Sequence, residues 1–393
     1  MRKILKLTNR RNFLFGLSSL AAISAGVISR GFDRHQKIEA LDHHQRDFTV
    51  SQGLSLKERA AKKGLIYGTT STKKYLTSDP AYMAAIVENC RMFVPEWEFK
   101  WTAGNALLRP GFDRFDFSAA DWIANFSATH QLLLRGHTLV WHSSLPKWFK
   151  ETVNSENAEQ LLQNHIQTFV KRYAGKIHSW DVVNEAIKTE DGRDDGLRIT
   201  PWLNSLGTNY IDLAFRLTSA VDPQALLVYN DFGLDYDTPK DEAKRDAVLK
   251  LLAGLKSQGT PIHALGIQAH LSPGGNNKFN PEKLRQFLKD VASLGLKIMI
   301  TEMDVTDKNL PVDIKVRDHI VAGVYEDYLA TVLDEKAVIA VITWGLSDRY
   351  SWLSEFEPRG DGTPVRPLPL DTQMRRKLAW NAIARAFDNA PQR

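Results

Sequence analysis

The chain contains the stretch Trp180-Asp181-Val182-Val183-Asn184-Glu185 and a second stretch of the same kind, Ile298-Met299-Ile300-Thr301-Glu302-Met303-Asp304, and the glutamates of the two stretches lie 117 positions apart. Each stretch is rich in apolar and β-branched residues and carries a glutamate at or near its end. Such runs are typical of strands that are buried on both faces, as in a parallel sheet. A glutamate at the carboxyl end of such a strand emerges at the rim, where α/β barrels place their functional side chains. The two stretches therefore predict two carboxylates at one rim.

Short apolar runs recur from about residue 56 onward, and amphipathic stretches separate most of them. Helical patterns are present at Ala158–Tyr173, Lys240–Lys256 and Pro281–Leu294, the last with Asn280 as the expected cap. Eight strands are predicted, at Leu65–Gly68, Met92–Val94, Leu132–Gly136, Ile177–Val183, Leu226–Tyr229, Ala264–Gln268, Lys297–Thr301 and Val338–Thr343.

Strands that alternate with helices predict a parallel sheet, and eight such strands predict its closure into a single (β/α)8 TIM barrel of the α/β class. The alternative is a doubly wound open sheet. That fold would need a glycine-rich phosphate-binding turn after the first strand, and Gly68-Thr69-Thr70-Ser71 lacks this pattern.

The first 31 residues form a separate unit of the sequence. A basic region precedes the apolar stretch Phe13–Ile28, and Arg10-Arg11-Asn12-Phe13-Leu14 resembles the twin-arginine export signal. Because the apolar stretch is short and rich in Ser and Gly, we expect no stable membrane span after export; a retained signal anchor is the alternative. We predict a twin-arginine-type signal segment at 1–31, a polar linker at 32–55 and the barrel at 56–390. The protein is then expected in the periplasm or outside the cell.

The net charge of +5 comes from the N-terminal segment. Residues 1–37 hold eight Lys and Arg and one acidic residue, so the rest of the chain holds 43 basic and 45 acidic residues. Nothing in this balance indicates a nucleic-acid partner. The single cysteine, Cys90, excludes an internal disulfide and a cysteine-based metal cluster.

Polar, aromatic and acidic residues follow every predicted strand except the first. Such groups are costly to remove from water, so a structural role alone would not collect them at one end of a barrel. From the second strand to the eighth they are Glu96, Trp97 and Lys100; His137, Trp141 and His142; Asn184 and Glu185; Asn230 and Asp231; Gln268 and His270; Glu302 and Asp304; and Trp344, Asp348 and Trp352.

The composition of this rim favours one class of reaction. The sequence has no phosphate-binding loop, no set of residues at metal-ligand spacing and no nucleophile elbow, so we expect neither a metal nor a cofactor. Amides can bind sugar hydroxyls, and indole faces suit the apolar faces of sugar rings. Paired carboxylates supply the acid and the nucleophile of glycosidic bond cleavage. The rim therefore predicts a glycoside hydrolase.

Four motifs occur in order on the predicted strands: Gly136-His137-Thr138-Leu139-Val140-Trp141-His142, Trp180-Asp181-Val182-Val183-Asn184-Glu185-Ala186, Thr301-Glu302-Met303-Asp304, and Trp344-Gly345 with Asp348 and Ser351-Trp352. Together they resemble glycoside hydrolase family 10, the endo-β-1,4-xylanase family, from about residue 57 to 388. The resemblance implies a retaining (β/α)8 barrel with catalytic glutamates on strands four and seven. That agrees with the positions of the two carboxylates.

The resemblance also implies a role for each residue around the cleaved bond. Glu185 would be the general acid/base, and Glu302 the ionised nucleophile. In retaining enzymes two such carboxyl groups lie roughly 5–5.5 Å apart. Asn184 would bond the sugar 2-hydroxyl, and His270, steadied by Asp304, would bond the nucleophile.

The other site residues are implied to bind substrate. His137, Trp141 and Lys100 would hold the sugar on the non-reducing side, and Trp344 and Trp352 would form aromatic walls around it. Further substrate contacts are expected from Glu96 and from Asn230 with the adjacent Asp231, and Gln268 is expected to contact sugar or Glu302.

Trp97 departs from the family pattern, which usually has Asn at this position. Either the second sugar on the non-reducing side is held by stacking on the indole, or the indole partly fills that subsite. The substitution bears on substrate preference and leaves the chemistry unchanged.

The sequence therefore predicts a monomeric endo-1,4-β-xylanase whose partner is xylan or a xylo-oligosaccharide. One alternative is a retaining β-1,4-glucanase or aryl-glycosidase of the same fold, although the bulk of Trp97, Trp344 and Trp352 should exclude the hydroxymethyl group of glucose. A non-catalytic sugar-binding protein is the other, and the presence of both glutamates argues against it.

Overall fold

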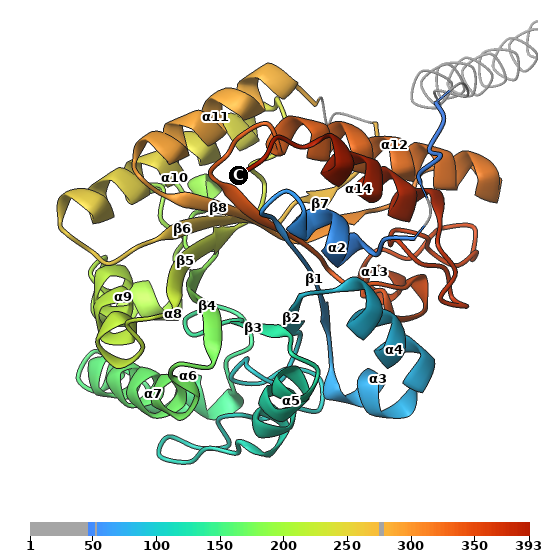
Figure 1. Ribbon diagram of the computed structural model, residues 1–393. Coiled ribbons are helices and arrows are strands. Elements are labelled where there is room, and N and C mark those ends of the chain that lie inside the picture. Colours follow the sequence, from blue (N-terminus) through green and yellow to red (C-terminus); the bar gives the residue numbers. More distant parts are fainter. Residues whose placement is uncertain (1–45, 52, 275–278) are drawn as a thin grey trace, which may run out of the picture.

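The computed structural model describes residues 46–51, 53–274 and 279–393. A ring of strands lies at its centre, and helices surround the ring (Figure 1). The strands are β1 (Ile66–Ser71), β2 (Met92–Pro95), β3 (Leu133–Gly136), β4 (Ile177–Asn184), β5 (Leu226–Asp231), β6 (Ala264–Ile267), β7 (His270–Leu271), β8 (Lys297–Val305) and β9 (Val338–Thr343).

All pairings between these strands are parallel, and neighbours follow the order β6-β5-β4-β3-β2-β1-β9-β8-β7. A further pairing of β6 with β8 closes the ring, for example at Leu265 and Ile298. Eight strands make the circuit, and the two-residue β7 pairs with the end of β8 only. The closed barrel confirms the predicted fold and excludes the open sheet.

The helices that cover the barrel begin with α2. Their bounds are α2 (Leu56–Ala61), α3 (Lys73–Ser78), α4 (Pro80–Asn89), α5 (Ser118–Thr129), α6 (Lys147–Thr152), α7 (Ala158–Tyr173), α8 (Pro201–Leu206), α9 (Tyr210–Val221), α10 (Pro239–Ser257), α11 (Pro281–Ser293), α12 (Ile314–Val332), α13 (Leu353–Phe356) and α14 (Leu378–Asn389). The predicted cap of α11 is confirmed, because the Asn280 side chain accepts a hydrogen bond from the Lys283 backbone N–H at 3.2 Å.

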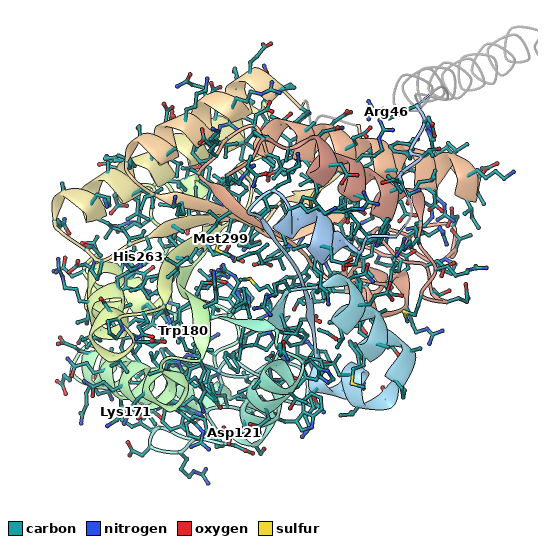
Figure 2. The ribbon with its side chains drawn as sticks, viewed as in Figure 1. Arg46, Asp121, Lys171, Trp180, His263 and Met299 are labelled. Atoms are coloured by element: carbon teal, nitrogen blue, oxygen red, sulfur yellow. The ribbon has the colours of Figure 1, made fainter. Side chains whose placement is uncertain are left out.

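The core has two parts, because alternate residues of a strand face opposite sides of the sheet. Trp180 belongs to the larger part, between strands and helices, and Met299 belongs to a smaller cluster with Val94, Val228 and Ile342 (both labelled residues are in Figure 2). Burial on both faces explains why the strands read as almost continuous apolar runs.

The described residues at the N-terminal side pack against the barrel. Arg46 forms an ion pair with Asp327 of α12 at 2.8 Å, and Phe48 is buried against His319 of the same helix. The final part of the predicted linker is therefore in contact with the barrel. The predicted signal segment at 1–31 lies outside the described residues, and within those residues no helix is both long and apolar enough to cross a membrane.

Candidate active site

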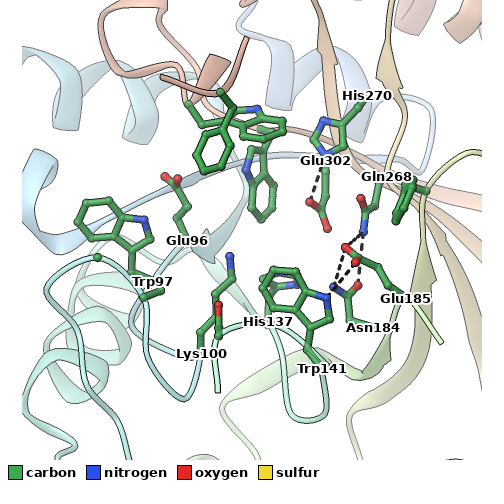
Figure 3. A pocket seen from close by; sticks show the side chains of 17 residues that line it. Glu96, Trp97, Lys100, His137, Trp141, Asn184, Glu185, Gln268, His270 and Glu302 are labelled. Carbon is green, nitrogen blue, oxygen red and sulfur yellow. Dashed lines mark hydrogen bonds and ion pairs between the residues drawn. The ribbon is translucent and has the colours of Figure 1, made fainter. Parts of the chain in front are cut away.

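A cleft of about 560 Å³ opens at the carboxyl ends of the strands. Twelve of the fourteen predicted site residues line it, and Figure 3 labels ten of these. The twelve are Glu96, Trp97, Lys100, His137, Trp141, Asn184, Glu185, Gln268, His270, Glu302, Trp344 and Trp352. The other two, Asn230 and Asp304, are buried directly behind the lining.

Glu185 directly follows β4, and its backbone has a φ of +59°. Its N–H donates to the carbonyl of Asn230 at 2.9 Å, which ties the turn to β5. The carboxylate accepts hydrogen bonds from Trp141 Nε1 at 2.9 Å, Gln268 Nε2 at 3.1 Å and Asn184 Nδ2 at 3.2 Å. Donors from the segments after β3 and β6 and from β4 itself thus fix the orientation of one carboxyl group in the cleft.

Glu302 lies on β8 with only 5% of its surface exposed. Its carboxylate accepts a hydrogen bond from Asn230 Nδ2 at 2.8 Å and lies 3.4 Å from His270 Nε2. Burial raises the pKa of Glu302, but the hydrogen bond from His270 and the electrostatic effects of His137, His270 and Lys100 outweigh it and lower the pKa to about 2. Glu302 is therefore ionised at neutral pH.

His270 is held between two carboxylates. Its Nδ1 lies 3.0 Å from Asp304 Oδ1, and Trp352 Nε1 donates to Asp304 Oδ2 at 2.7 Å. Burial lowers the pKa of His270, whereas Asp304 and Glu302 raise it more strongly, to about 10. The imidazole is therefore cationic, and both ring N–H groups donate. The pairing of His270 in β7 with Asp304 in β8 sets this geometry.

Asn230 was predicted from the sequence to contact substrate. In the structure it lies below the cleft surface instead. Its side chain is fully buried, and its amide N–H group donates to Asn184 at 2.9 Å as well as to Glu302. Its carbonyl oxygen accepts from Thr301 Oγ1 at 2.7 Å. Gly266 makes room for this amide, since a Cβ there would lie 2.2 Å from Asn230 Oδ1. The neighbouring Asp231 also faces away from the cleft and pairs with Lys244 at 2.7 Å.

Lys100 stands in the middle of the cleft. Its ammonium group lies 5.1 Å from the ring centre of Trp141 and 5.6 Å from that of Trp344. Beside it, His137 Nδ1 lies 2.9 Å from Asp181, a residue inside β4 that also pairs with Arg135. Burial raises the pKa of Glu96 to about 7, although Lys100 opposes this shift.

Sequence reasoning missed several residues at the site. Phe232 lines the cleft and directly follows Asn230 and Asp231, so its place after β5 could have been found. Phe356 also lines the cleft, but it lies in α13, away from any strand end. Thr301 and Gly266 act through Asn230, and no pattern in the sequence marks that contact. Within residues 46–51, 53–274 and 279–393, no group of three or more His, Cys, Asp or Glu is arranged to hold a metal ion.

A model of glycosyl hydrolase family 10 matches residues 55–386. The chain belongs to this family. The match includes every strand of the barrel and every residue that lines the cleft.

Individual family-10 proteins resemble the chain over most of its length. Endo-1,4-beta-xylanase 5 of Pyricularia oryzae is 33% identical over 377 residues, which cover 94% of this chain and 85% of that protein. Xylanase 10B of Thermotoga maritima has a solved structure that superposes with a TM-score of 0.76 at 31% identity, covering 85% of this chain and 98% of that one. Xylanase 10B of Thermotoga petrophila, solved in complex with xylobiose, gives a TM-score of 0.75 at 30% identity, covering 86% and 99%.

Proposed function

We propose that this family-10 protein is an endo-1,4-β-xylanase that cleaves internal xylosidic bonds of xylan with retention at the anomeric carbon. One observation carries the proposal. The side chains of Glu185 and Glu302 face one cleft and are linked through the amides of Asn184 and Asn230. Two carboxylates fixed at one site are what glycosidic bond cleavage needs, and the family to which the chain belongs supports retention.

In the first step, Glu302 attacks the anomeric carbon while Glu185 gives its proton to the leaving glycosidic oxygen. The bond between these two sugar units breaks, and a covalent glycosyl ester forms on Glu302. In the second step, Glu185 takes a proton from water, and the water oxygen displaces Glu302 from the anomeric carbon. The ionised state of Glu302 and its contact with His270 support its assignment as the nucleophile.

The supporting residues then take the following roles. Asn184 lies between Glu185 and Asn230, where its amide can reach a hydroxyl next to the reacting carbon. His270 and Asp304 hold Glu302 in its charged form. Trp344 and Trp352 wall the cleft, while Lys100, His137 and Gln268 offer polar groups to the sugar.

The proposal is tested by comparing the hydrolysis of xylan with that of a soluble β-1,4-glucan. We expect xylan to be cleaved much faster, with xylo-oligosaccharides of several lengths as early products, because glucose carries a hydroxymethyl group that xylose lacks. Comparable rates on the glucan would favour the glucanase alternative. If the protein binds xylan but cleaves neither polymer, and E302Q binds equally well, the non-catalytic alternative holds.

We also infer that the protein acts as a monomer and is exported by the twin-arginine route. The arginine pair and the apolar stretch that follows it support the route. That system carries folded cargo, which suits a chain with a single cysteine and no disulfide to form after export.

A further inference from the structure

One end of the cleft is more aromatic than catalysis alone requires. Trp97 and Phe356 both line it, and neither contributes to the contacts that hold Glu185 or Glu302. Trp97 and Glu96 lie at the side of the cleft remote from Glu302, Gln268 and Glu185 (Figure 3). Lys100 lies between this end and the end that holds Glu302 (Figure 3), and it interacts electrostatically with both Glu96 and Glu302.

The direction of the substrate chain follows from the position of Glu185. The leaving sugar must lie beside the group that protonates it. Phe232 is one aromatic residue on that side, since Arg198 donates to the Glu185 carbonyl at 2.7 Å and its guanidinium lies 5.9 Å from the centre of the Phe232 ring. The opposite end, with Glu96 and Trp97, therefore receives the non-reducing part of the chain.

Trp97 is fixed before any substrate arrives. Its ring packs on the bare Cα of Gly104, where a Cβ would lie 2.5 Å from the indole, and Gly104 has a φ of +54°. Tyr75 contacts the indole, with 5.8 Å between ring centroids, and stacks in turn on Tyr350 at 4.4 Å. Because the ring is supported by neighbours, its ordering adds little entropic cost when a sugar binds.

Phe356 is 70% exposed, although it is a large apolar side chain. Its ring packs at 5.0 Å from that of Trp352, whose indole is anchored on Asp304. Tyr350, which stacks on the Tyr75 that contacts Trp97, lies three residues before the start of α13, so the chain enters α13 from the Trp97 end of the cleft. Because this exposed ring lines the cleft, it is available to contact a ligand there.

We propose that Trp97 and Phe356 are specificity-determining residues that form an aromatic clamp for the second xylose on the non-reducing side of the cleaved bond. The inference rests on the proposed xylanase function and deepens it. The two rings contact the apolar C–H surface of the sugar, and Glu96 lies beside its hydroxyls. Stacking on the indole thus replaces the hydrogen-bonding amide usual at position 97, and the subsite stays open.

The test uses two synthetic substrates, an aryl β-xyloside with one sugar and an aryl β-xylobioside with two. Only the second substrate reaches the clamp. For W97A and F356A we expect the ratio of kcat/KM on the xylobioside to kcat/KM on the xyloside to fall about tenfold or more, equivalent to about 1.4 kcal/mol of lost binding. W97F should restore most of the ratio. V312A, which removes a side chain that is 60% exposed and lies outside the cleft lining, is the matched control and should leave the ratio unchanged.

The clamp would be overturned if kcat/KM fell equally on both substrates, or if the ratio were unchanged in both W97A and F356A. A higher ratio in W97A would also overturn it, because the indole would then obstruct the subsite. G104A gives a second measure, because the added methyl group must displace the indole. It should lower the ratio even though Trp97 is still present. If the unaltered protein cleaves neither aryl glycoside nor xylan, the proposed function itself fails, and that outcome is distinct from a failure of the clamp.

Discussion

Glu185 and Glu302 differ in the charge of the groups that contact their carboxylates. Glu185 accepts hydrogen bonds from neutral donors of Trp141, Asn184 and Gln268, whereas Glu302 lies beside the cationic His270. A cationic partner favours the ionised form of a carboxyl group more strongly than neutral donors do. The difference suits Glu302 for nucleophilic attack and leaves the proton transfer to Glu185.

Replacing Glu185 should slow the reaction to a degree that depends on the leaving group. For E185Q we expect kcat/KM on xylan to fall by about 10²–10⁴-fold, because general acid catalysis is lost. On an aryl xylobioside with an acidic phenol the loss should be much smaller, since that leaving group needs no proton. Steady-state kinetics on both substrates measure the difference, with E282Q on the exposed surface of α11 as the control. Equal losses on the two substrates would exclude the acid role.

Replacing His270 should change the pH dependence of the reaction. In H270N the cation beside Glu302 is lost, so the pKa of Glu302 should rise above its present value of about 2. The acid limb of the kcat/KM profile should therefore move to higher pH, and the rate at neutral pH should fall. A profile with an unchanged acid limb would show that His270 does not control the charge of Glu302.

The ion pair between Glu302 and His270 predicts how the stability of the fold depends on pH. The lowered pKa of Glu302 contributes stability that is full above about pH 4.5, its unfolded value, and is lost as the pH falls through about 2. The raised pKa of His270 contributes stability that is full below about pH 6.5 and is lost as the pH rises through about 10. The difference in unfolding free energy between the unaltered protein and H270N should therefore be largest between about pH 4.5 and 6.5, where both contributions are full, and should decrease at lower and at higher pH.

The eight strands of the barrel were predictable from sequence, and both ends of β9 were predicted correctly, but the carboxyl ends of several other strands were not. The prediction stopped at Gly68 and Thr301, whereas β1 continues to Ser71 and β8 to Val305. The predicted strands followed the apolar runs, which end where the polar functional side chains begin. Hydrogen bonding between the backbones of neighbouring strands continues beyond that point, up to the rim of the barrel. The two-residue β7 has too few residues to give a periodic pattern, and it is set by its pairing with β8.

Gly266 lies in β6, between Asn230 of β5 and Thr301 of β8, and a side chain at this position should be destabilising. G266A places a methyl group against Asn230 and Thr301, so we expect a loss of about 1–3 kcal/mol in unfolding free energy from overpacking, together with lower activity. Chemical denaturation and xylan hydrolysis measure the two effects. G254A in α10 is the matched control, because a Cβ there meets no atom within 4 Å. Full stability in G266A would mean that the Asn230 bridge does not need the space.

Across the whole molecule, the closed barrel and most of the cleft followed from sequence because strand order determines which ends meet. Motifs at the strand ends gave twelve residues that the fold then brought together. The contacts that depend on side-chain direction did not follow. Asn230 belongs to a strand end yet is directed between Asn184 and Glu302, and Phe356 reaches the cleft from a short helix.

Export is a property of the whole chain and is tested at the arginine pair. In a bacterial host with a twin-arginine system, R10K/R11K should leave xylanase activity in the cytoplasmic fraction, whereas the unaltered chain places it outside the inner membrane. A matched R2K/K3R variant, which conserves charge elsewhere in the basic region, should be exported normally. Normal export of R10K/R11K would indicate another route.

The central claim is that Glu302 attacks the anomeric carbon in a retaining reaction, and trapping the covalent intermediate tests it most directly. An activated aryl 2-deoxy-2-fluoro-β-xylobioside should form a glycosyl ester that hydrolyses slowly. Mass spectrometry of the digested protein should then find one added glycosyl group on the peptide that contains Glu302, at that residue. A label on Glu185 or on any other residue, or full turnover of xylan with no label at all, would contradict the account.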